Sequence, residues 1–151
     1  MKVLGIDPGS VSAAYAYLDV EDPFSHPEVG DVPVVNKMVD AASFSEMLAR
    51  NRPDVAIIET VGAMPKQGVS SSFRFGVGCG LLRGVIQAWK IPLHEVSPSK
   101  WKKKFGLDSD GEKSRELALA LYPGTEGLHL KKHHGRAEAL LLALYHSETK
   151  T

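Results

Sequence analysis

Five apolar segments have the pattern of β-strands, and they occupy residues 3–6, 12–20, 32–39, 55–58 and 91–96. The segments 3–6 and 55–58 are continuously apolar, as expected of strands that are covered on both faces. Residues 21–30 are polar and contain Pro23 and Pro27, which indicates an exposed connection between the second and third strands.

Helical spacing of apolar residues predicts helices over residues 43–49, 73–90, 111–122 and 132–145, and a further helical turn opens at Ser97 and Pro98. The segment 73–90 carries four glycines, each of which costs a helix interior about 1 kcal/mol relative to alanine. Close packing against another backbone would offset this cost. The segment is therefore either an internal packing helix or a contact between two copies of the chain.

Acidic residues close two of the apolar segments, because Asp7 follows residues 3–6 and Glu59 follows residues 55–58. Either acid alone is usually a turn former or a helix cap. The repeated pattern of a strand followed by an acid favours a second interpretation. Two carboxylates at one sheet edge are well placed to hold a divalent cation against a phosphate.

Glu138 is the acid within the otherwise apolar face of the last helix, and a buried acid must be paired or must bind a cation. His134 precedes it by four residues and shares its helix face, whereas His133 reaches that face only if the first turn is frayed. The alternative for the pair of His134 and Glu138 is that they form only a hydrogen bond at the surface. Two cations about 4 Å apart, bridged by carboxylates, are a common device for hydrolysing a phosphodiester.

The composition is that of a soluble globular protein, with 151 residues, 43% hydrophobic and 24% charged, and we expect a single domain over residues 1–151. No apolar run approaches the roughly 20 residues of a membrane span, and no signal peptide is evident. The chain has one cysteine, Cys79, which excludes an internal disulfide and is expected to be a small buried residue. The missing membrane span, signal peptide and disulfide together predict a cytoplasmic protein.

Charge is unevenly distributed although the net charge is zero. Residues 1–60 carry 4 Lys or Arg against 10 Asp or Glu, and residues 61–151 carry 14 against 8. A fold that gathers the basic groups on one surface would bind phosphates there and hold metal at its acidic positions.

Five motifs together resemble the RuvC family of Holliday junction resolvases, most closely the versions carried by phages and prophages, and the likeness runs from Lys2 to about Tyr145. The motifs are Asp7-Pro8-Gly9-Ser10, Ile58-Glu59, Gln67-Gly68-Val69-Ser70-Ser71, Trp101-Lys102-Lys103 and Gly135-Arg136-Ala137-Glu138-Ala139.

The resemblance implies an α/β, RNase H-like fold with a five-stranded mixed sheet flanked by helices. It also implies a homodimer that nicks opposed strands of a four-way DNA junction, in DNA recombination and repair, in the cytoplasm of a bacterial or phage-infected cell. Two Mg²⁺ or Mn²⁺ ions per active site are expected, with no nucleotide cofactor and no membrane.

Matched by position, Asp7, Glu59 and Glu138 are expected to be catalytic metal ligands. The family usually presents a second carboxylate shortly before the helical acid, and this chain has His133 and His134 there. We therefore expect a histidine among the metal ligands, with His134 as the catalytic member. A neutral imidazole gives the site less negative charge, which favours Mn²⁺.

Basic and polar residues after Glu59 are the candidate DNA contacts: Lys66, Gln67, Ser70, Arg74, Lys100, Lys102, Lys103, Lys104, Lys132 and Arg136. The lysine run lies between Trp101 and Phe105, and charge with stacking surfaces suits branched DNA. A solvated helix face is the alternative. Phe73 and Phe75 either stack on bases or, as we favour, pack in the core.

Taken with this resemblance, these residues predict a structure-selective, metal-dependent endodeoxyribonuclease, and the resemblance implies a Holliday junction resolvase. Two alternatives stay open: an RNase H-like nuclease that acts on an RNA precursor, and a branched-DNA-binding protein whose catalysis is impaired by the histidine replacement. A sugar-kinase-like ATPase is disfavoured because the chain is too short for two lobes.

Overall fold

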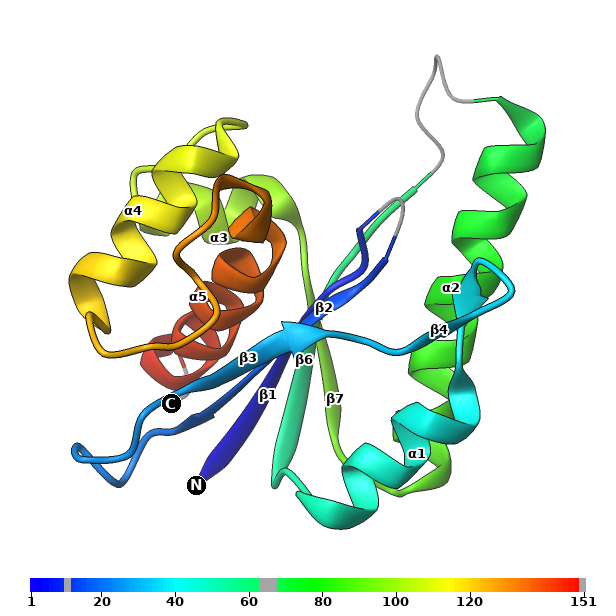
Figure 1. Cartoon of the computed structure of the whole chain (residues 1–151), viewed down its shortest axis with the longest axis horizontal. Coiled ribbons are helices and arrows are strands. Elements are labelled where there is room, and N and C mark those ends of the chain that lie inside the picture. The colour runs from blue at the N-terminus through cyan, green and yellow to red at the C-terminus, as the bar shows by residue number, and fades with distance from the viewer. Residues whose placement is uncertain (10–11, 63–67, 150–151) are drawn as a thin grey trace.

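A computed structural model describes residues 1–9, 12–62 and 68–149, and within them one five-stranded mixed sheet forms the centre of the molecule (Figure 1). The strand order is β3-β2-β1-β6-β7. β1 pairs antiparallel with β2 and parallel with β6, and β6 pairs parallel with β7. The strands are β1 (Lys2–Asp7), β2 (Ala14–Asp19), β3 (Glu28–Asp31), β6 (Val55–Glu59) and β7 (Leu93–Val96).

Helices cover both faces of this sheet, as Figure 1 shows. Alternate side chains of β1 point to opposite faces of the sheet. Leu4 and Ile6 belong to the core under α1 and α2, whereas Val3 belongs to the core under α3, α4 and α5. The helices are α1 (Ala41–Arg50), α2 (Val69–Ala88), α3 (Pro98–Lys104), α4 (Gly111–Leu121) and α5 (His134–Thr149), the last preceded by a 3₁₀ turn, η1 (Lys131–His133).

The third strand of the sheet is not the segment 32–39, as the sequence predicts, but Glu28–Asp31. This edge strand pairs with β2 through its backbone, and of its side chains Val29 packs against the core, so its apolar pattern is weak. Residues 32–39 instead contain a two-stranded hairpin, β4 (Val34–Val35) and β5 (Met38–Val39), whose turn places Asn36 and Lys37 in the left-handed region.

Gly5 lets α5 approach β1 closely. A Cβ on Gly5 would overlap the carbonyl oxygen of Ala139 and lie 3.0 Å from the backbone nitrogen of Ala143. Small residues on both elements therefore bring the two backbones into contact. This contact fixes the start of α5 beside the carboxyl end of β1.

α2 leaves much of its surface uncovered, because within the described residues only Leu82 and Ile86 are buried on it. A Cβ on Gly76, Gly80 or Gly84 would meet no atom within 4 Å. An internal packing helix is therefore not the explanation of these glycines.

Two side chains of α2 also differ from expectation. Phe73 is 74% exposed, so its predicted core role is wrong, and Cys79 is half-buried rather than buried. Among the described residues, no helix has both the length and the apolar character needed to cross a bilayer.

Candidate active site

Asp7 and Glu59 lie side by side at one edge of the sheet. β1 and β6 run parallel with Ile6 opposite Ile58, so the acid that follows each of these residues emerges at the same edge. The sequence-based expectation that the two acids share an edge is therefore met. Because both strands are buried on both faces, the register leaves the two carboxyl groups little freedom to move apart.

Glu138 reaches the same edge from the start of α5. Its side chain is buried and close enough to Asp7 to raise the pKa of that acid, and its Oε2 accepts a hydrogen bond of 2.9 Å from Oγ of Ser114. The Lys102 Nζ lies 3.6 Å from the same Oε2. The structure thus brings three carboxyl groups and one amine together from four separate elements.

Two of these carboxyl groups, Asp7 and Glu59, have raised pKa values. Burial, with the charges of Glu59 and Glu138, raises the pKa of Asp7 to about 8, and the nearby Lys102 opposes this shift. Burial also raises the pKa of Glu59, which is partly offset by its hydrogen bond from Trp101 and by Lys102. A site in which acids repel one another in this way favours the binding of a cation.

Trp101 is a member of the site and not a surface for stacking on DNA. Its side chain is fully buried, and its Nε1 donates a hydrogen bond of 2.7 Å to Oε2 of Glu59. The interpretation of Trp101 as a DNA-stacking group is therefore wrong. The Nζ of the neighbouring Lys102 lies 5.5 Å from the centre of the indole ring, so the ring also stabilises the ammonium group by a cation–π interaction.

Sequence reasoning missed two positioning residues, the indole N–H of Trp101 and the hydroxyl of Ser114. Ser114 is fully buried on α4, one turn before the buried Ala118. A serine within the apolar face of an amphipathic helix signals a polar partner in the interior, and that signal is present in the sequence. The identity of the partner, Glu138, is decided by the packing of α4 against α5.

The two histidines make their described contacts away from the carboxylates. His133 is buried, and its Nδ1 accepts a hydrogen bond of 3.2 Å from the N–H of Leu130. Burial and the charge of Arg136 lower the pKa of His133. His134 is exposed, and a Cβ on Gly111 would touch its ring. The assignment of either histidine as a metal ligand stays a prediction with less geometric support than the three carboxylates have.

The helix position that faces Asp7 is Gly135. A Cβ there would lie 3.6 Å from Oδ2 of Asp7 and 3.5 Å from Cβ of Ala14, which is ordinary van der Waals contact. This is the place from which a further helical ligand would reach Asp7. In this chain it carries no side chain.

Besides Lys102, which pairs with Glu138, two predicted DNA contacts are engaged in ion pairs within the described residues. Arg136 donates from Nε and Nη2 to the two carboxylate oxygens of Asp31, at 3.0 and 3.1 Å, and so joins α5 to β3. Lys104 pairs with Glu148 at 3.6 Å, near the opposite end of α5 from Glu138. Neither cation is free to serve the site, so we leave both out of the proposed DNA surface.

The remaining predicted DNA contacts that the structure describes lie on α2, α3 and η1. Ser70 and Arg74 are exposed on the first turns of α2, Lys100 and Lys103 are exposed on α3, and Lys132 is exposed on η1. Lys66 and Gln67 lie outside the described residues.

The chemistry of the three carboxylates fits a hard divalent cation. All of their donor atoms are oxygens, which Mg²⁺ and Mn²⁺ prefer, and their mutual repulsion is relieved by positive charge. Across residues 1–9, 12–62 and 68–149, however, no three His, Cys, Asp or Glu side chains are already arranged around one point. One oxygen of Glu59 and one of Glu138 are engaged by protein donors.

Comparison with curated proteins finds full-length relatives. The crossover junction endodeoxyribonuclease RuvC of Chlamydia trachomatis is 24% identical over 155 residues, which span 96% of this chain and 90% of that protein. The RuvC of Chlorobium chlorochromatii is 23% identical over 161 residues, spanning 95% of this chain and 78% of that protein. No protein-family model matches the chain.

Solved structures show the same fold. Thermus thermophilus RuvC in complex with a Holliday junction substrate superposes with a TM-score of 0.72 at 18% identity, covering 97% of this chain and 93% of that one. The fowlpox virus Holliday junction resolvase superposes with a TM-score of 0.64 at 16% identity over 100% of both chains. The chain has an RNase H-like α/β fold. Its resemblance to the RuvC resolvases is confirmed.

Proposed function

We propose that this chain is a metal-dependent endonuclease that cleaves phosphodiester bonds in branched DNA, with the four-way junction as its substrate. The observation that carries the proposal is the gathering of Asp7, Glu59 and Glu138 beside the amine of Lys102. The relatives named above support the choice of substrate.

Asp7, Glu59 and Glu138 would hold divalent cations, and the ions, when bound, supply an activated water and stabilise the leaving oxygen. The protein holds the carboxyl groups in place by burial and by the donors Trp101 and Ser114. Because three carboxylates are available and Gly135 adds none, we propose that Mn²⁺ supports cleavage at lower concentrations than Mg²⁺.

Lys102 has two roles in this proposal. Its ammonium group limits the repulsion among the acids before the substrate binds, because its charge lowers the pKa of Asp7 and of Glu59. Its half-buried position at the same edge also lets it contact a phosphate that approaches the carboxylates.

Two opposed nicks in one junction require two active sites, so we propose that the chain works as a homodimer. The uncovered face of α2, with the exposed Phe73 and Val77 beside Gly80, is the proposed contact between copies. Sedimentation of the purified chain tests this, and a monomer at micromolar concentration would contradict it.

The function is tested by incubating the purified chain with a synthetic four-way junction, a linear duplex and an RNA hairpin, each with Mg²⁺ or Mn²⁺. We expect paired nicks in the junction and intact duplex and RNA. Binding without nicks under both metals would favour a branched-DNA-binding protein, and cleavage of the RNA alone would favour an RNA-processing nuclease.

Asp7→Asn is the matched inactive variant, because it removes charge from the site but leaves the basic surface unchanged. It should abolish nicking and retain junction binding in a gel-shift assay. Loss of binding together with nicking would count against the metal-ligand role of Asp7.

A further inference from the structure

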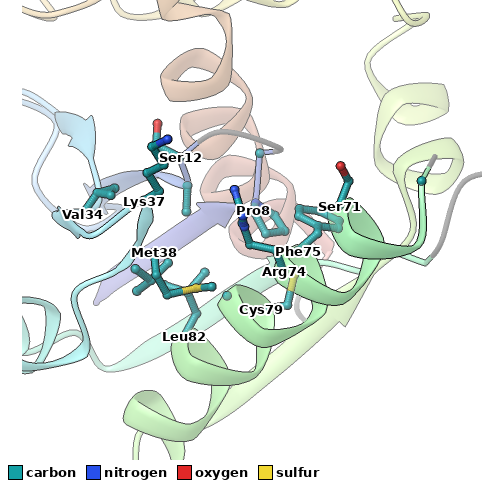
Figure 2. A pocket seen from close by; sticks show the side chains of 15 residues that line it. Pro8, Ser12, Val34, Lys37, Met38, Ser71, Arg74, Phe75, Cys79 and Leu82 are labelled. Atoms are coloured by element: carbon teal, nitrogen blue, oxygen red, sulfur yellow. The ribbon is translucent and has the colours of Figure 1, made fainter.

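A cavity of about 390 Å³ opens next to the active site, between the β4–β5 hairpin, the turn after β1 and the first turns of α2 (Figure 2). Its volume falls in the range of small-molecule sites. Pro8 and Gly9 form part of its wall and directly follow Asp7. The cavity therefore borders the segment that carries Asp7.

The cavity combines an apolar floor with positive charge. Met38, Phe75 and Leu82 supply the floor, and Lys37 and Arg74 belong to its lining on the hairpin and on α2. Figure 2 shows Arg74 extending from α2 toward Pro8, with Lys37 on the hairpin across the cavity.

Both cations are available to a ligand. Within the described residues, neither Lys37 nor Arg74 has an ion-pair partner, and both are exposed. Two unpaired cations at one cavity favour an anionic occupant, and the floor favours one that also has an apolar, planar part.

We propose that this cavity binds one unstacked nucleotide of the branched DNA, with its base on the apolar floor and its phosphate between Lys37 and Arg74. The proposal rests on the proposed nuclease function and extends it by a nucleotide subsite beside the cut. A base that is splayed from its stack in branched DNA can enter such a cavity, whereas a base within a linear duplex cannot do so without unstacking.

Lys37 is held at the cavity by a tight turn. Asn36 and Lys37 have φ values of 50° and 61°, so the hairpin turns within two left-handed residues and presents Lys37 at its tip. The site is therefore built on two defined elements, the hairpin and α2.

Cys79 provides a direct test, because it lines the cavity and is the only cysteine of the chain. Burial raises the pKa of its thiol, so alkylation is followed at mildly alkaline pH. The full chain is treated with iodoacetamide alone and with saturating junction, in Ca²⁺ to limit cutting. We expect the junction to slow alkylation about tenfold or more because the bound nucleotide covers the thiol.

A series of junctions, each with a single abasic nucleotide, then identifies the occupant. Removal of the base at one position beside the nick should restore alkylation, while abasic sites elsewhere should not. Protection that is equally strong with every abasic junction would overturn the proposal, because it would show that phosphate contacts or a second copy of the chain cover the cavity.

Lys37→Glu should weaken junction binding about tenfold and remove the protection of Cys79. Lys90→Glu is the matched control, since Lys90 is also an exposed lysine with a positive φ, at the opposite end of α2. We expect it to change neither quantity. Equal effects of the two substitutions would overturn the assignment of Lys37.

Gly78→Leu fills the cavity without removing charge, because a Cβ on Gly78 would already lie 3.8 Å from Sδ of Met38. In this variant the junction should no longer slow the alkylation of Cys79, and junction binding should be weaker. Its circular dichroism spectrum must match that of the native chain for the comparison to hold. A bound junction that leaves Cys79 unprotected in the native chain would overturn the subsite alone. A chain that binds no junction would overturn the nuclease function as well.

Discussion

The indole N–H of Trp101 donates a hydrogen bond of 2.7 Å to Oε2 of Glu59, although the two residues lie 42 positions apart in the chain. Trp101 is fully buried on α3, and Glu59 ends β6. The bond therefore fixes one carboxylate oxygen of the site from inside the core. It also stabilises the ionised form of Glu59, against the effect of burial on its pKa.

Trp101→Phe should lower the rate of junction cleavage about 10- to 100-fold, as expected when a buried partner that orients a metal ligand is removed. Glu59 would lose its donor, and a higher concentration of Mn²⁺ would be needed for half-maximal cleavage. The measurement is the cleavage rate against Mn²⁺ concentration, with junction binding measured in parallel.

Trp89→Phe is the matched control for Trp101→Phe. Trp89 also donates from Nε1 to a side chain, the Oγ of Ser45 at 2.9 Å, but it lies at the end of α2 and contacts none of the site residues described here. Both substitutions should reduce stability. If the two variants show the same metal dependence as the native chain, the positioning role of Trp101 is wrong.

The raised pKa of Asp7 predicts how stability depends on pH without metal. In the native chain Asp7 keeps its proton up to about pH 8, whereas the unfolded chain releases it near the ordinary value of 3.8. The native state therefore binds the extra proton between these values, and the free energy of unfolding falls as pH rises from about 4 to about 8. The slope from one group cannot exceed about 1.4 kcal/mol per pH unit.

Thermal unfolding in EDTA, compared between the native chain and Asp7→Asn, measures this contribution. The variant should be more stable than the native chain at pH 8 and should lose the part of the slope that Asp7 causes. Added Mn²⁺ should stabilise the native chain more at pH 8 than at pH 5. Identical pH profiles for the two proteins would exclude a buried, repelled Asp7.

Gly135→Asp places a carboxylate at the helix position that faces Asp7. We expect it to lower the Mg²⁺ concentration needed for half-maximal cleavage about tenfold, because a fourth acid increases the charge that holds the ion. The same substitution should lower the melting temperature of the metal-free chain, since it adds a further acid to a partly buried site that then holds no cation to offset its charge.

Gly135→Asn has nearly the same shape without the charge, so it separates electrostatic from steric effects. It should leave the metal-free melting temperature closer to that of the native chain and should not lower the Mg²⁺ requirement. A lower Mg²⁺ requirement in both variants would point to a steric cause.

Gly5→Ala should destabilise the chain by about 1–3 kcal/mol, because the added methyl group meets the backbone of Ala139 and Ala143. α5 must shift from β1, so Glu138 moves relative to Asp7 and cleavage should fall as well. Gly84→Ala is the control: its Cβ would meet nothing within 4 Å, and alanine should stabilise the helix by about 1 kcal/mol. Urea denaturation of both variants tests the pair, and equal stability changes would contradict the close contact.

Features at the surface of the molecule follow less directly from the sequence than buried ones. β3 is an edge strand that pairs through its backbone, so an apolar pattern gives little sign of it, and Phe73 reads as a core residue but is exposed on α2. Arg136 reads as a DNA contact but pairs with Asp31. In each case the local sequence shows only whether a residue is polar or apolar. Its actual partner depends on which distant element of the chain packs opposite it.

The sequence by itself determined the buried strands and the acids that end them. Continuous apolar segments must be covered on both faces, and their length and end points place Asp7 and Glu59 at strand termini whatever the rest of the chain does. The helical spacing of the last segment likewise places Glu138 on a core-facing surface. These are local properties, because burial of a face is encoded in the residues of that face.

The tertiary structure alone decided how these acids meet and which groups support them. The parallel pairing of β1 with β6, the close approach of α5 at Gly5, and the packing of α3 and α4 bring Trp101 to Glu59 and Ser114 to Glu138. Each of these contacts joins segments far apart in the chain. Periodicity fixes the direction in which a side chain points, but its partner is set by the packing of whole elements against one another.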